Sequence, residues 1–533
     1  MEADYVIVGA GSAGCVLAER LSAGGASVIL LEAGPRDRSV LIHVPAGVAK
    51  LSGHPVYDWG FEASPEPLTG GRVIKLPRGK VLGGTSSING MNFVRGVAAD
   101  FDAWAQAGCR GWSYDDVLPH FKAIEQTESG DDHTRGRSGP IAVEPYRTVL
   151  PITHRFVAAA QQAGFTLMPD INGDATEGVG YSQMSRRGRF RQSTASTFLA
   201  AARRRPNLQI ETGAVATRLT FQGLRCSGVD FRQDGVDQHA VARREMIVSA
   251  GAICSPQLLQ ISGIGAAAQL RDLGVDVVLD RPSVGHNLSD HYTAPLSARV
   301  LDALTVNQMR RWPRLGLEML RWVVTGRGAL TFGATTASVY CRSRPDVASP
   351  DLQLLFFPGS FDPANMPELE REPGLRVSAT LARPRSRGTV LATSSDPFAA
   401  PQIKLGYLSD PDDLRVLVEG LKIARRILAA PAIAPLIRRE TAPGAQAQSD
   451  EAIAQHVRNA GTTVHHLAGT CRMGEDLEAV VDSRLRVRGI GGLRVIDASI
   501  MPTVTTGNIN APIIMIADKG AAMILEDAAT LKH

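Results

Sequence analysis

The pattern of apolar runs, glycines and amphipathic stretches predicts a mixed α/β protein. Residues 5–8 are an unbroken apolar run, as in a buried parallel strand. A glycine-rich turn follows, then a helix over 15–21 and a second apolar run at 27–31 that ends at Glu32. Residues 412–428 carry apolar side chains at helical spacing, which predicts an amphipathic helix with one face on a core.

Other stretches predict further strands. The sequence from 212 to 248 is strand-like. Residues 340–410 contain short alternating runs separated by Pro and Gly, which predict a second, β-rich domain. Residues 309–324 are basic and amphipathic. Such a segment is compatible with contact to a membrane surface, but we favour a helix that covers the active site or the core.

Composition narrows the function classes. A chain of 533 residues with 44% hydrophobic and 21% charged residues is typical of a multidomain globular protein. The net charge of +4 is small for this size, so we expect no nucleic-acid partner. Six scattered cysteines without metal spacing predict neither a disulfide framework nor a metal site. With no basic and apolar leader pattern at the start, we expect a cytoplasmic protein.

The first forty residues predict a dinucleotide site. Gly9, Gly11 and Gly14 form a G-x-G-x-x-G between the first strand and helix. Gly9 permits the turn, Gly11 lets a pyrophosphate approach the backbone, and Gly14 packs helix on strand. Glu32, at the end of the second strand, can accept a hydrogen bond from an adenosine ribose. FAD and NAD share this half-site, so these residues alone do not choose between them.

Further motifs follow in a fixed order. A second glycine-rich loop spans residues 78–96, and so dense a cluster predicts a backbone that passes close to a flat ligand. The later motifs are Gly251–Gly265, Val284–His291, Thr463–Gly474, Asp497–Pro502 and Asn508–Pro512.

Together these segments resemble the signatures of the glucose–methanol–choline (GMC) oxidoreductases over essentially the whole chain, and most closely the bacterial alcohol and choline dehydrogenase branch. The resemblance implies FAD and an interleaved architecture. A Rossmann-like FAD-binding domain is expected from residues 1–150, 195–295 and 460–533. A substrate domain built on an antiparallel β-sheet with helices is expected from 151–194 and 296–459.

The resemblance also implies the chemistry. His466 matches the family's catalytic histidine, and a histidine suits the removal of an alcohol proton before a hydride passes to flavin N5. Asn510 falls where the family places a hydrogen-bond partner of the substrate oxygen; its other interpretation is a cap of the last helix. The implied cofactor-binding residues are Gly9, Gly11, Ser12, Ala13, Gly14, Glu32, Ala33, Gly79, Val81, Leu82, Thr85, Asn89, Gly90, Met91, Asn92, Val215, His465, Asp497 and Ala498.

Three positions refine the expectation. Ile88 stands where family members with covalent FAD carry a histidine, so we expect non-covalent FAD. Trp59 matches an aromatic residue near the flavin, although a core role is almost as well supported. His465 falls beside the flavin at a position usually aromatic, and we favour packing without proton transfer.

Three activities fit these residues. The favoured one is oxidation of a primary or secondary alcohol, with electrons passed to a quinone or other acceptor. The same half-reaction with O2, giving H2O2, is an alternative. A non-oxidative flavin-binding lyase is a third, because one fold hosts many functions. The substrate pocket carries no guiding motif; no aromatic cage for a quaternary ammonium is evident, so choline is not favoured.

Overall fold

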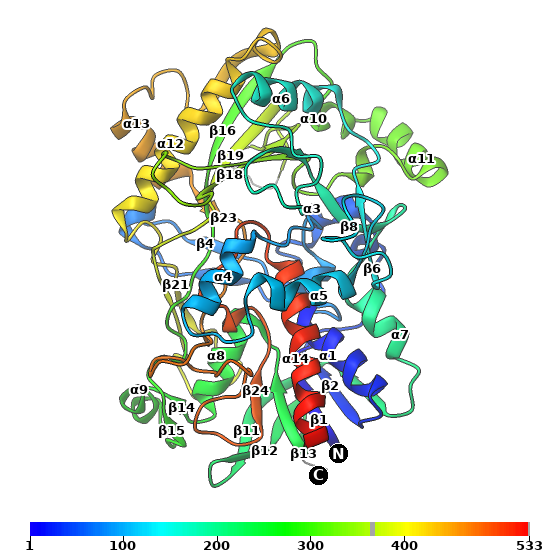
Figure 1. The fold of residues 1–533 in the computed structure, drawn as a ribbon, viewed down its shortest axis with the longest axis vertical. Coiled ribbons are helices and arrows are strands. Elements are labelled where there is room, and N and C mark those ends of the chain that lie inside the picture. The colour runs from blue at the N-terminus through cyan, green and yellow to red at the C-terminus, as the bar shows by residue number, and fades with distance from the viewer. Residues whose placement is uncertain (363–367, 531–533) are drawn as a thin grey trace.

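Two lobes, each built on its own β-sheet, make up the computed structural model, which describes residues 1–362 and 368–530 (Figure 1). The first sheet holds β1 (Glu2–Val8), β2 (Val28–Glu32), β10 (Leu208–Thr212), β11 (Ala214–Gln222), β12 (Arg225–Gln233), β13 (Val236–Val248) and β24 (Leu493–Val495). Its order is β10-β2-β1-β13-β12-β11, and β24 pairs with β13. β10, β2, β1, β13 and β24 run parallel, whereas β11 and β12 add an antiparallel edge. The predicted Rossmann-like half is confirmed.

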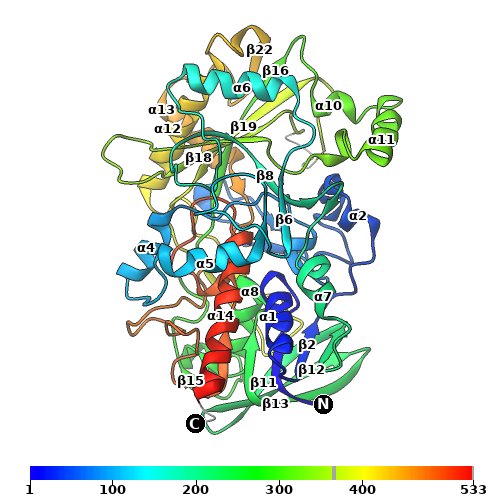
Figure 2. The same ribbon diagram turned by 45° about the vertical axis from the view of Figure 1, so that its right-hand side comes forward.

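Helices cover this sheet because small residues allow close packing. Figure 2 shows α1 (Ser12–Ala23) and α14 (Asn510–Thr530) side by side against the strands. Ala13, Gly14 and Ala18 are buried on α1. α8 (Gly251–Ile261) lies on the same lobe. Since α1 and α8 begin directly after β1 and β13, the carboxyl edge of the parallel strands becomes a natural ligand site.

The second sheet is antiparallel throughout, as predicted. It holds β7 (Gly178–Tyr181), β16 (Tyr292–Val300), β17 (Ala337–Cys341), β18 (Leu352–Phe357), β19 (Gly374–Leu381), β22 (Ile437–Ala442) and β23 (Thr462–Thr463), in the order β22-β16-β19-β18-β17-β7 with β23 on β16. α12 (Pro411–Leu428) packs on β16, β18 and β19 through the predicted apolar stripe. Asp410 caps this helix by accepting from Asp412 N.

The remaining helices and strands lie outside the two large sheets. The other helices are α2 (Val40–His43), α3 (Val48–Leu51), α4 (Ala98–Gln106), α5 (Tyr114–Ile124), α6 (Pro151–Gln162), α7 (Ala200–Ala202), α9 (Ala267–Asp272), α10 (Val306–Met309), α11 (Arg314–Thr325) and α13 (Asp450–Ala460). The short strands are β3 (Phe61–Ala63), β4 (Ile74–Leu76), β5 (Glu125–Gln126), β6 (Ile141–Pro145), β8 (Gln183–Arg187), β9 (Phe190–Arg191), β14 (Ile264–Gly265), β15 (Leu279–Asp280), β20 (Thr389–Leu391) and β21 (Gln402–Lys404).

The domain boundaries stay predictions, and two strands bear on them. Every strand of the first sheet lies inside the segments assigned to the FAD domain. β16, however, begins at Tyr292, and β23 joins the second sheet from within the segment 460–533. Within the described residues, none of the helices has the length and apolar character to cross a membrane.

Candidate active site

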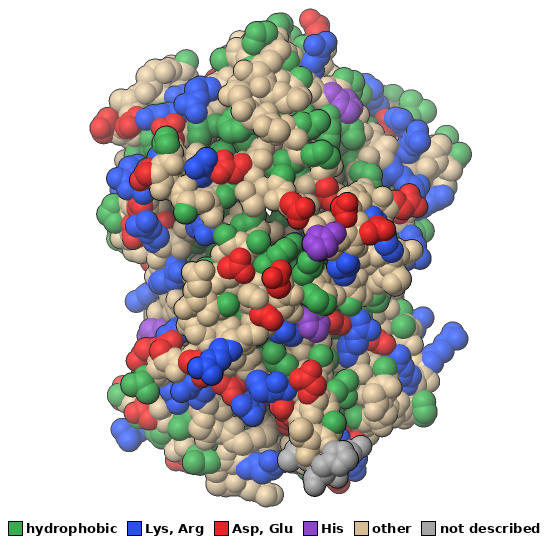
Figure 3. All heavy atoms as spheres, viewed as in Figure 1, with side chains coloured by type: hydrophobic (Ala, Val, Ile, Leu, Met, Phe, Trp, Pro, Cys, Tyr) green, Lys and Arg blue, Asp and Glu red, His purple; other side chains and the backbone are tan. Residues whose placement is uncertain are grey.

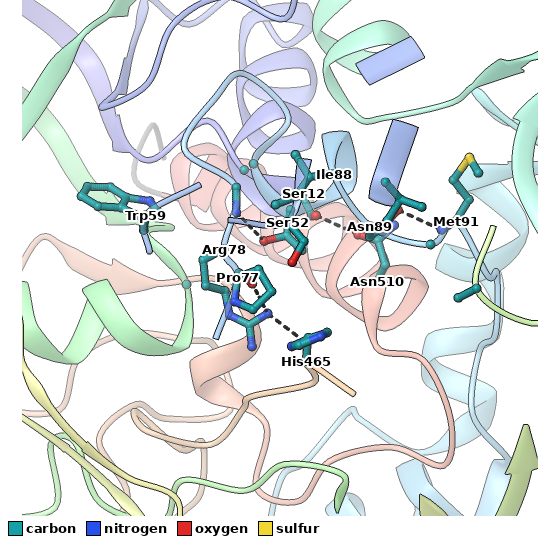
Figure 4. Close-up of a pocket in the computed structure, with 18 of the residues that line it drawn as sticks. Ser12, Ser52, Trp59, Pro77, Arg78, Ile88, Asn89, Met91, His465 and Asn510 are labelled. Carbon is teal, nitrogen blue, oxygen red and sulfur yellow. Dashed lines mark hydrogen bonds between the residues drawn. The ribbon is translucent and has the colours of Figure 1, made fainter. Parts of the chain in front are cut away.

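A cavity of about 1130 Å³ lies where loops from both sheets meet. Its wall includes the glycine turn after β1, the second glycine-rich loop, the loop after β23 and the start of α14. Segments that are up to about 500 residues apart in the chain therefore share one site, as Figure 4 shows for Ser12 and Asn510.

The glycine turn has the form that a dinucleotide requires. Gly9 has φ +96°, and a Cβ there would meet Ser249 O at 2.6 Å. A Cβ on Gly14 would lie 1.9 Å from Gly9 O, so this glycine holds α1 against the strand. A Cβ on Gly11 would meet no atom within 4 Å, and no side chain caps α1 there. The first N–H groups of α1 are thus available to a pyrophosphate.

Several buried polar atoms on the wall have no hydrogen-bond partner among the described residues. They include Arg78 Nη2, Asn92 Oδ1 and Asn508 Oδ1, and all three residues line the cavity. Buried polar groups are rarely left in this state. Together with the open face of Gly11, they indicate that the residues present fit a large polar cofactor such as FAD.

Glu32 is buried at the end of β2 and accepts two backbone hydrogen bonds. Its Oε2 accepts from Ala10 N and its Oε1 from Gly34 N, each at 2.9 Å. Burial raises the pKa of Glu32 to about 7. The carboxylate therefore fixes the glycine turn and keeps lone pairs for a ribose hydroxyl.

Most residues predicted to bind the cofactor line the cavity. They are Gly9, Gly11, Ser12, Ala13, Glu32, Ala33, Gly79, Thr85, Asn89, Gly90, Met91, Asn92, Val215, His465, Asp497 and Ala498. Gly14, Val81 and Leu82 do not. Val81 is fully buried in a small cluster with Ile42, Leu51 and Ile88. The backbone N–H of Leu82 is donated to Pro35 O. These two residues support the loop instead of facing the cavity.

Ile88 and Trp59 both reach the cavity. Ile88 is 5% exposed and offers only an alkyl side chain to the wall. Trp59 lies on the wall with the Lys80 ammonium 4.7 Å from its ring centroid and Phe61 stacked beside it. Trp59 is thus a wall residue of the cavity as well as a packing partner.

His466 lines the cavity and makes a hydrogen-bonding contact through each ring nitrogen. It lies in the loop after β23 and is 8% exposed. Its Nε2 is 3.0 Å from Asn508 Nδ2, and its Nδ1 is 2.9 Å from His291 Nδ1. Burial, followed by the charges of His291, His465 and Arg78, lowers the pKa of His466 well below its ordinary value. The ring is therefore neutral at pH 7.

We assign the protons of the histidine pair from the contact with the Ala382 carbonyl. His291 Nε2 is 3.2 Å from Ala382 O, which can only accept, so His291 carries its proton on Nε2. Burial lowers the pKa of His291 to about 4, so its Nδ1 is a lone-pair acceptor. The proton between the two Nδ1 atoms therefore belongs to His466. This leaves His466 Nε2 unprotonated, and Asn508 Nδ2 donates to it.

Asp290 holds this histidine pair in place. Its Oδ1 accepts from the backbone N–H of His291 at 2.9 Å and of His466 at 2.7 Å. Its Oδ2 accepts from Thr463 Oγ1 at 2.6 Å and from the Tyr407 hydroxyl. Burial raises the pKa of Asp290, which these donors oppose. One buried carboxylate thus fixes both loops that carry the histidines.

The structure places Asn508, and not the predicted Asn510, in contact with His466. Asn510 is the first residue of α14, and its Oδ1 accepts from Ser12 Oγ at 2.8 Å, on the glycine turn (Figure 4). The amide beside His466 is Asn508. The reason is local geometry: the chain turns into the helix between the two residues, which sends their side chains to different parts of the cavity.

His465 takes up a separate position on the wall. It has φ +69°, its N–H donates to Thr463 Oγ1 at 2.6 Å, and its carbonyl accepts from Arg78 Nη1 at 2.9 Å (Figure 4). These contacts fix the backbone of His465, and its ring nitrogens form no hydrogen bond with the described residues. The arrangement agrees with packing without proton transfer.

Sequence reasoning missed His291, Asn508 and Asp290 as site residues. His291 and Asp290 end the motif Val284–His291, and Asn508 opens the motif that holds Asn510. The motifs were therefore visible, but nothing in their spacing showed which polar side chains face His466.

Comparisons with known proteins agree over almost the whole chain. The sequence profile of the GMC oxidoreductases matches residues 3–293 with its N-terminal part and 384–517 with its C-terminal part. An oxygen-dependent choline dehydrogenase of Brucella suis biovar 1 is 40% identical over 531 residues, covering 98% of this chain and 96% of that protein. An alcohol dehydrogenase [acceptor] of Pseudomonas putida is 39% identical over 539 residues, covering 99% and 97%.

A solved structure has the same fold. Pyridoxine 4-oxidase from Mesorbium loti superposes with a TM-score of 0.89 at 30% sequence identity, covering 97% of this chain and 98% of that one. These comparisons and the glycine turn of the cavity indicate the same family. The chain belongs to the GMC oxidoreductases, and its cofactor is FAD.

Proposed function

We propose that the protein oxidises an apolar primary or secondary alcohol to the aldehyde or ketone. FAD, when bound, supplies the acceptor of the hydride at flavin N5. The proton of the hydroxyl goes to His466 Nε2. The observation that carries the proposal is the hydrogen-bond chain from Ala382 O through His291 and His466, which leaves that nitrogen as a base at the cavity.

His466 is suited to this step because its other nitrogen is already engaged. When Nε2 takes a proton, the Nδ1–H of the ring still donates to His291 Nδ1, 2.9 Å away. The resulting cation keeps an acceptor in a buried setting, which lowers the cost of its charge. His291 itself is fully buried and its Nε2–H is used by Ala382 O, so it orients the base and does not meet the substrate.

Asn508 supports the reacting oxygen in this proposal. Its Nδ2 donates to His466 Nε2, and a substrate hydroxyl that enters between the two residues takes over both contacts. The amide then donates to the oxygen as negative charge develops there, and it does not compete as a base. Asn510, held by Ser12, belongs to the cofactor side of the cavity.

The far wall of the cavity favours an apolar alcohol. Residues of the second lobe that line it are mainly aliphatic and aromatic: Val306, Leu315, Met319, Leu330, Phe332, Leu355, Phe357, Phe361 and Leu369. Arg310 and Arg376 are the charged side chains on this part of the described wall. Glu32 and Asp497 are the acidic residues among all described lining residues, and both hold backbone groups on the FAD-domain side.

A quaternary ammonium such as that of choline finds little support here. Such a cation is bound by carboxylates or by the faces of aromatic rings. Three rings of the wall already carry a cation at 4.7–5.9 Å: Lys80 over Trp59, Arg189 over Trp322 and Arg376 over Phe361. The positive charge of the arginines would also repel it. The Brucella relative, named a choline dehydrogenase, therefore supports alcohol oxidation as the reaction but gives less support to choline as the substrate.

An isosteric substrate pair tests this proposal. Choline and 3,3-dimethyl-1-butanol have the same shape and differ in the charge. Under anaerobic conditions we expect both the neutral alcohol and a long-chain or aryl alcohol to bleach the flavin with at least about tenfold higher second-order rate constants than choline. Faster bleaching by choline would contradict the apolar assignment, and no bleaching by any alcohol would contradict the reaction.

The electron acceptor in the proposal is a quinone or another carrier. The Pseudomonas relative carries "acceptor" in its name. Oxygen is the second candidate, because the Brucella relative is named oxygen-dependent and the superposed structure is an oxidase. Measuring H2O2 yield and quinone reduction on one alcohol-reduced sample discriminates the two: stoichiometric H2O2 with slow quinone reduction would support the oxidase.

A further inference from the structure

α11 presents its apolar side outward. The large apolar side chains on one continuous arc of this helix are all exposed: Leu317 67%, Met319 49%, Leu320 60%, Val323 56% and Val324 68%. At 100° per residue they cover an arc of about 160°, with Gly316 between them. An apolar arc of this width normally faces a core. Figure 1 and Figure 2 instead show α11 at the outer edge of its lobe.

The inward side of α11 is held by a polar contact. Glu318, 6% exposed, is the buried residue of this helix, and its Oε2 accepts from the backbone N–H of Ala329 at 2.9 Å. Trp322, half-buried, packs edge-on against Phe190 and under the Arg189 guanidinium. These contacts fix how α11 is turned about its own axis, so the fold itself directs the apolar arc outward.

Arginines border one flank and the beginning of the apolar arc. Arg314 and Arg321 lie on one flank of the helix, and Arg310 and Arg311 precede it together with Trp312, which is 78% exposed. Figure 3 shows basic and apolar side chains next to one another at this edge of the molecule. Among the described residues, Arg310, Arg314 and Arg327 form no ion pair, whereas the nearby Glu370 and Glu372 are paired with Arg299.

We propose that α11 and the Trp312 turn dock on the surface of an anionic lipid bilayer. An exposed apolar arc with an arginine rim and a tryptophan at one end matches a helix that lies in the plane of the lipid headgroups. The arginines favour anionic lipid over a second copy of this chain, because two copies would bring like charges together. The surface belongs to α11 itself and does not rest on the proposed reaction.

The position of α11 gives such docking a consequence for ligand entry. Leu315, Met319, Trp322 and Val323 also line the cavity, so the apolar arc is continuous with the cavity wall. If α11 docks on a bilayer, this part of the cavity wall lies next to the lipid. An apolar alcohol or a quinone dissolved in the bilayer could then reach the cavity along apolar side chains.

Vesicle sedimentation with matched variants tests the proposal. The holoenzyme is mixed with vesicles of phosphatidylcholine alone or with 30% phosphatidylglycerol, at low and high salt. We expect binding to the anionic vesicles that weakens with salt, a blue shift of tryptophan fluorescence that is reduced in Trp312→Phe, and at least tenfold weaker binding by the double variant Leu317→Glu/Leu320→Glu. Leu477→Glu, which changes a leucine elsewhere that is even more exposed (85%), serves as the control and should bind like the parent.

Other outcomes would overturn the proposal. Equal binding by the parent and the double variant would show that α11 is not the docking surface. No binding to either vesicle, together with a dimer that the double variant dissolves, would show that a second copy covers the arc. No vesicle binding and a monomeric parent would also contradict it. Since Leu317 and Leu320 do not line the cavity, flavin reduction by a water-soluble alcohol should persist in the double variant and shows that it is folded.

Discussion

His291 and His466 face each other through their Nδ1 atoms, 2.9 Å apart, with their rings nearly perpendicular at 88°. Two neutral imidazoles at this distance share one proton, and the Ala382 carbonyl decides which ring carries it. His291 therefore fixes the tautomer of His466, in which Nδ1 carries the proton and the lone pair of Nε2 faces the cavity.

Removing the base should slow flavin reduction without loss of FAD. For His466→Ala we expect anaerobic reduction by alcohol to fall about 10²–10⁴-fold, the usual effect of losing a general base. Asn508→Ala should lose about 10–10³-fold, since it removes one donor to the oxygen. Stopped-flow absorbance measures both.

Asn510→Ala is the matched control for Asn508→Ala, because Asn510 is two residues further along the chain and contacts Ser12 on the cofactor side of the cavity. It should mainly weaken FAD binding. A larger loss of flavin reduction in Asn510→Ala than in Asn508→Ala, at full FAD occupancy, would restore Asn510 as the partner of the base.

His291 should act through His466. In His291→Ala the Nδ1–H of His466 loses its acceptor, so the tautomer is no longer fixed; we expect a loss of about 10–100-fold in flavin reduction. The cation formed on His466 also loses this acceptor, so the pKa of His466 should fall further and the acid limb of the pH profile should move to lower pH.

His291→Gln, whose amide oxygen can accept the same proton, should recover part of the rate. If the pH profile of His291→Ala is unchanged and its rate is lowered only because the variant folds poorly, His291 has a structural role alone.

The rate of flavin reduction should be flat around neutral pH. Because the pKa of His466 is lowered, its base form is present at pH 7 and is lost only as pH falls through the lowered value. We expect no decline between pH 8 and about 6.5, the ordinary histidine pKa. Limiting rates measured from pH 5 to 8 check this, and an acid limb centred above about 6.5 would contradict it.

FAD affinity should weaken in acid because of Glu32. The pKa of Glu32 without ligand is raised to about 7, and a ribose hydroxyl that donates to the carboxylate favours its charged form. FAD should therefore bind progressively more weakly as pH falls below about 7, and evenly above it.

Titration of the apoprotein with FAD at several pH values measures this dependence. Glu32→Gln should bind about 10–100-fold more weakly and lose the pH dependence. A parent protein whose FAD affinity is independent of pH would argue against a ribose contact at Glu32.

FAD should leave the protein intact on denaturation. Ile88 occupies the position of the tethering histidine and offers no nucleophilic atom. After acid precipitation we expect the yellow colour in the supernatant and the mass of unmodified FAD. Flavin that stays with the precipitated chain would reveal a covalent link at another residue.

The sequence by itself determined the cofactor half of this protein. Gly9, Gly11, Gly14 and Glu32 are spaced by the fixed dimensions of a strand, a turn and a helix, so their roles follow from local geometry. The short alternating runs likewise predicted a β-rich second domain, because side chains in a strand alternate with a period of two, and the family resemblance implied that its sheet is antiparallel. The identity of His466 came from a motif whose residues are contiguous.

Only the tertiary structure decided which groups meet His466. His291 is 175 positions away in the chain, and its Nδ1 reaches His466 because Asp290 ties both loops together. The family motif pointed to Asn510, whereas the start of α14 directs Asn508 to His466 and Asn510 to Ser12. The periodicity of α11 predicted an apolar face but not its direction, since that depends on Glu318 being anchored to Ala329, a contact between side chain and backbone that no periodicity records.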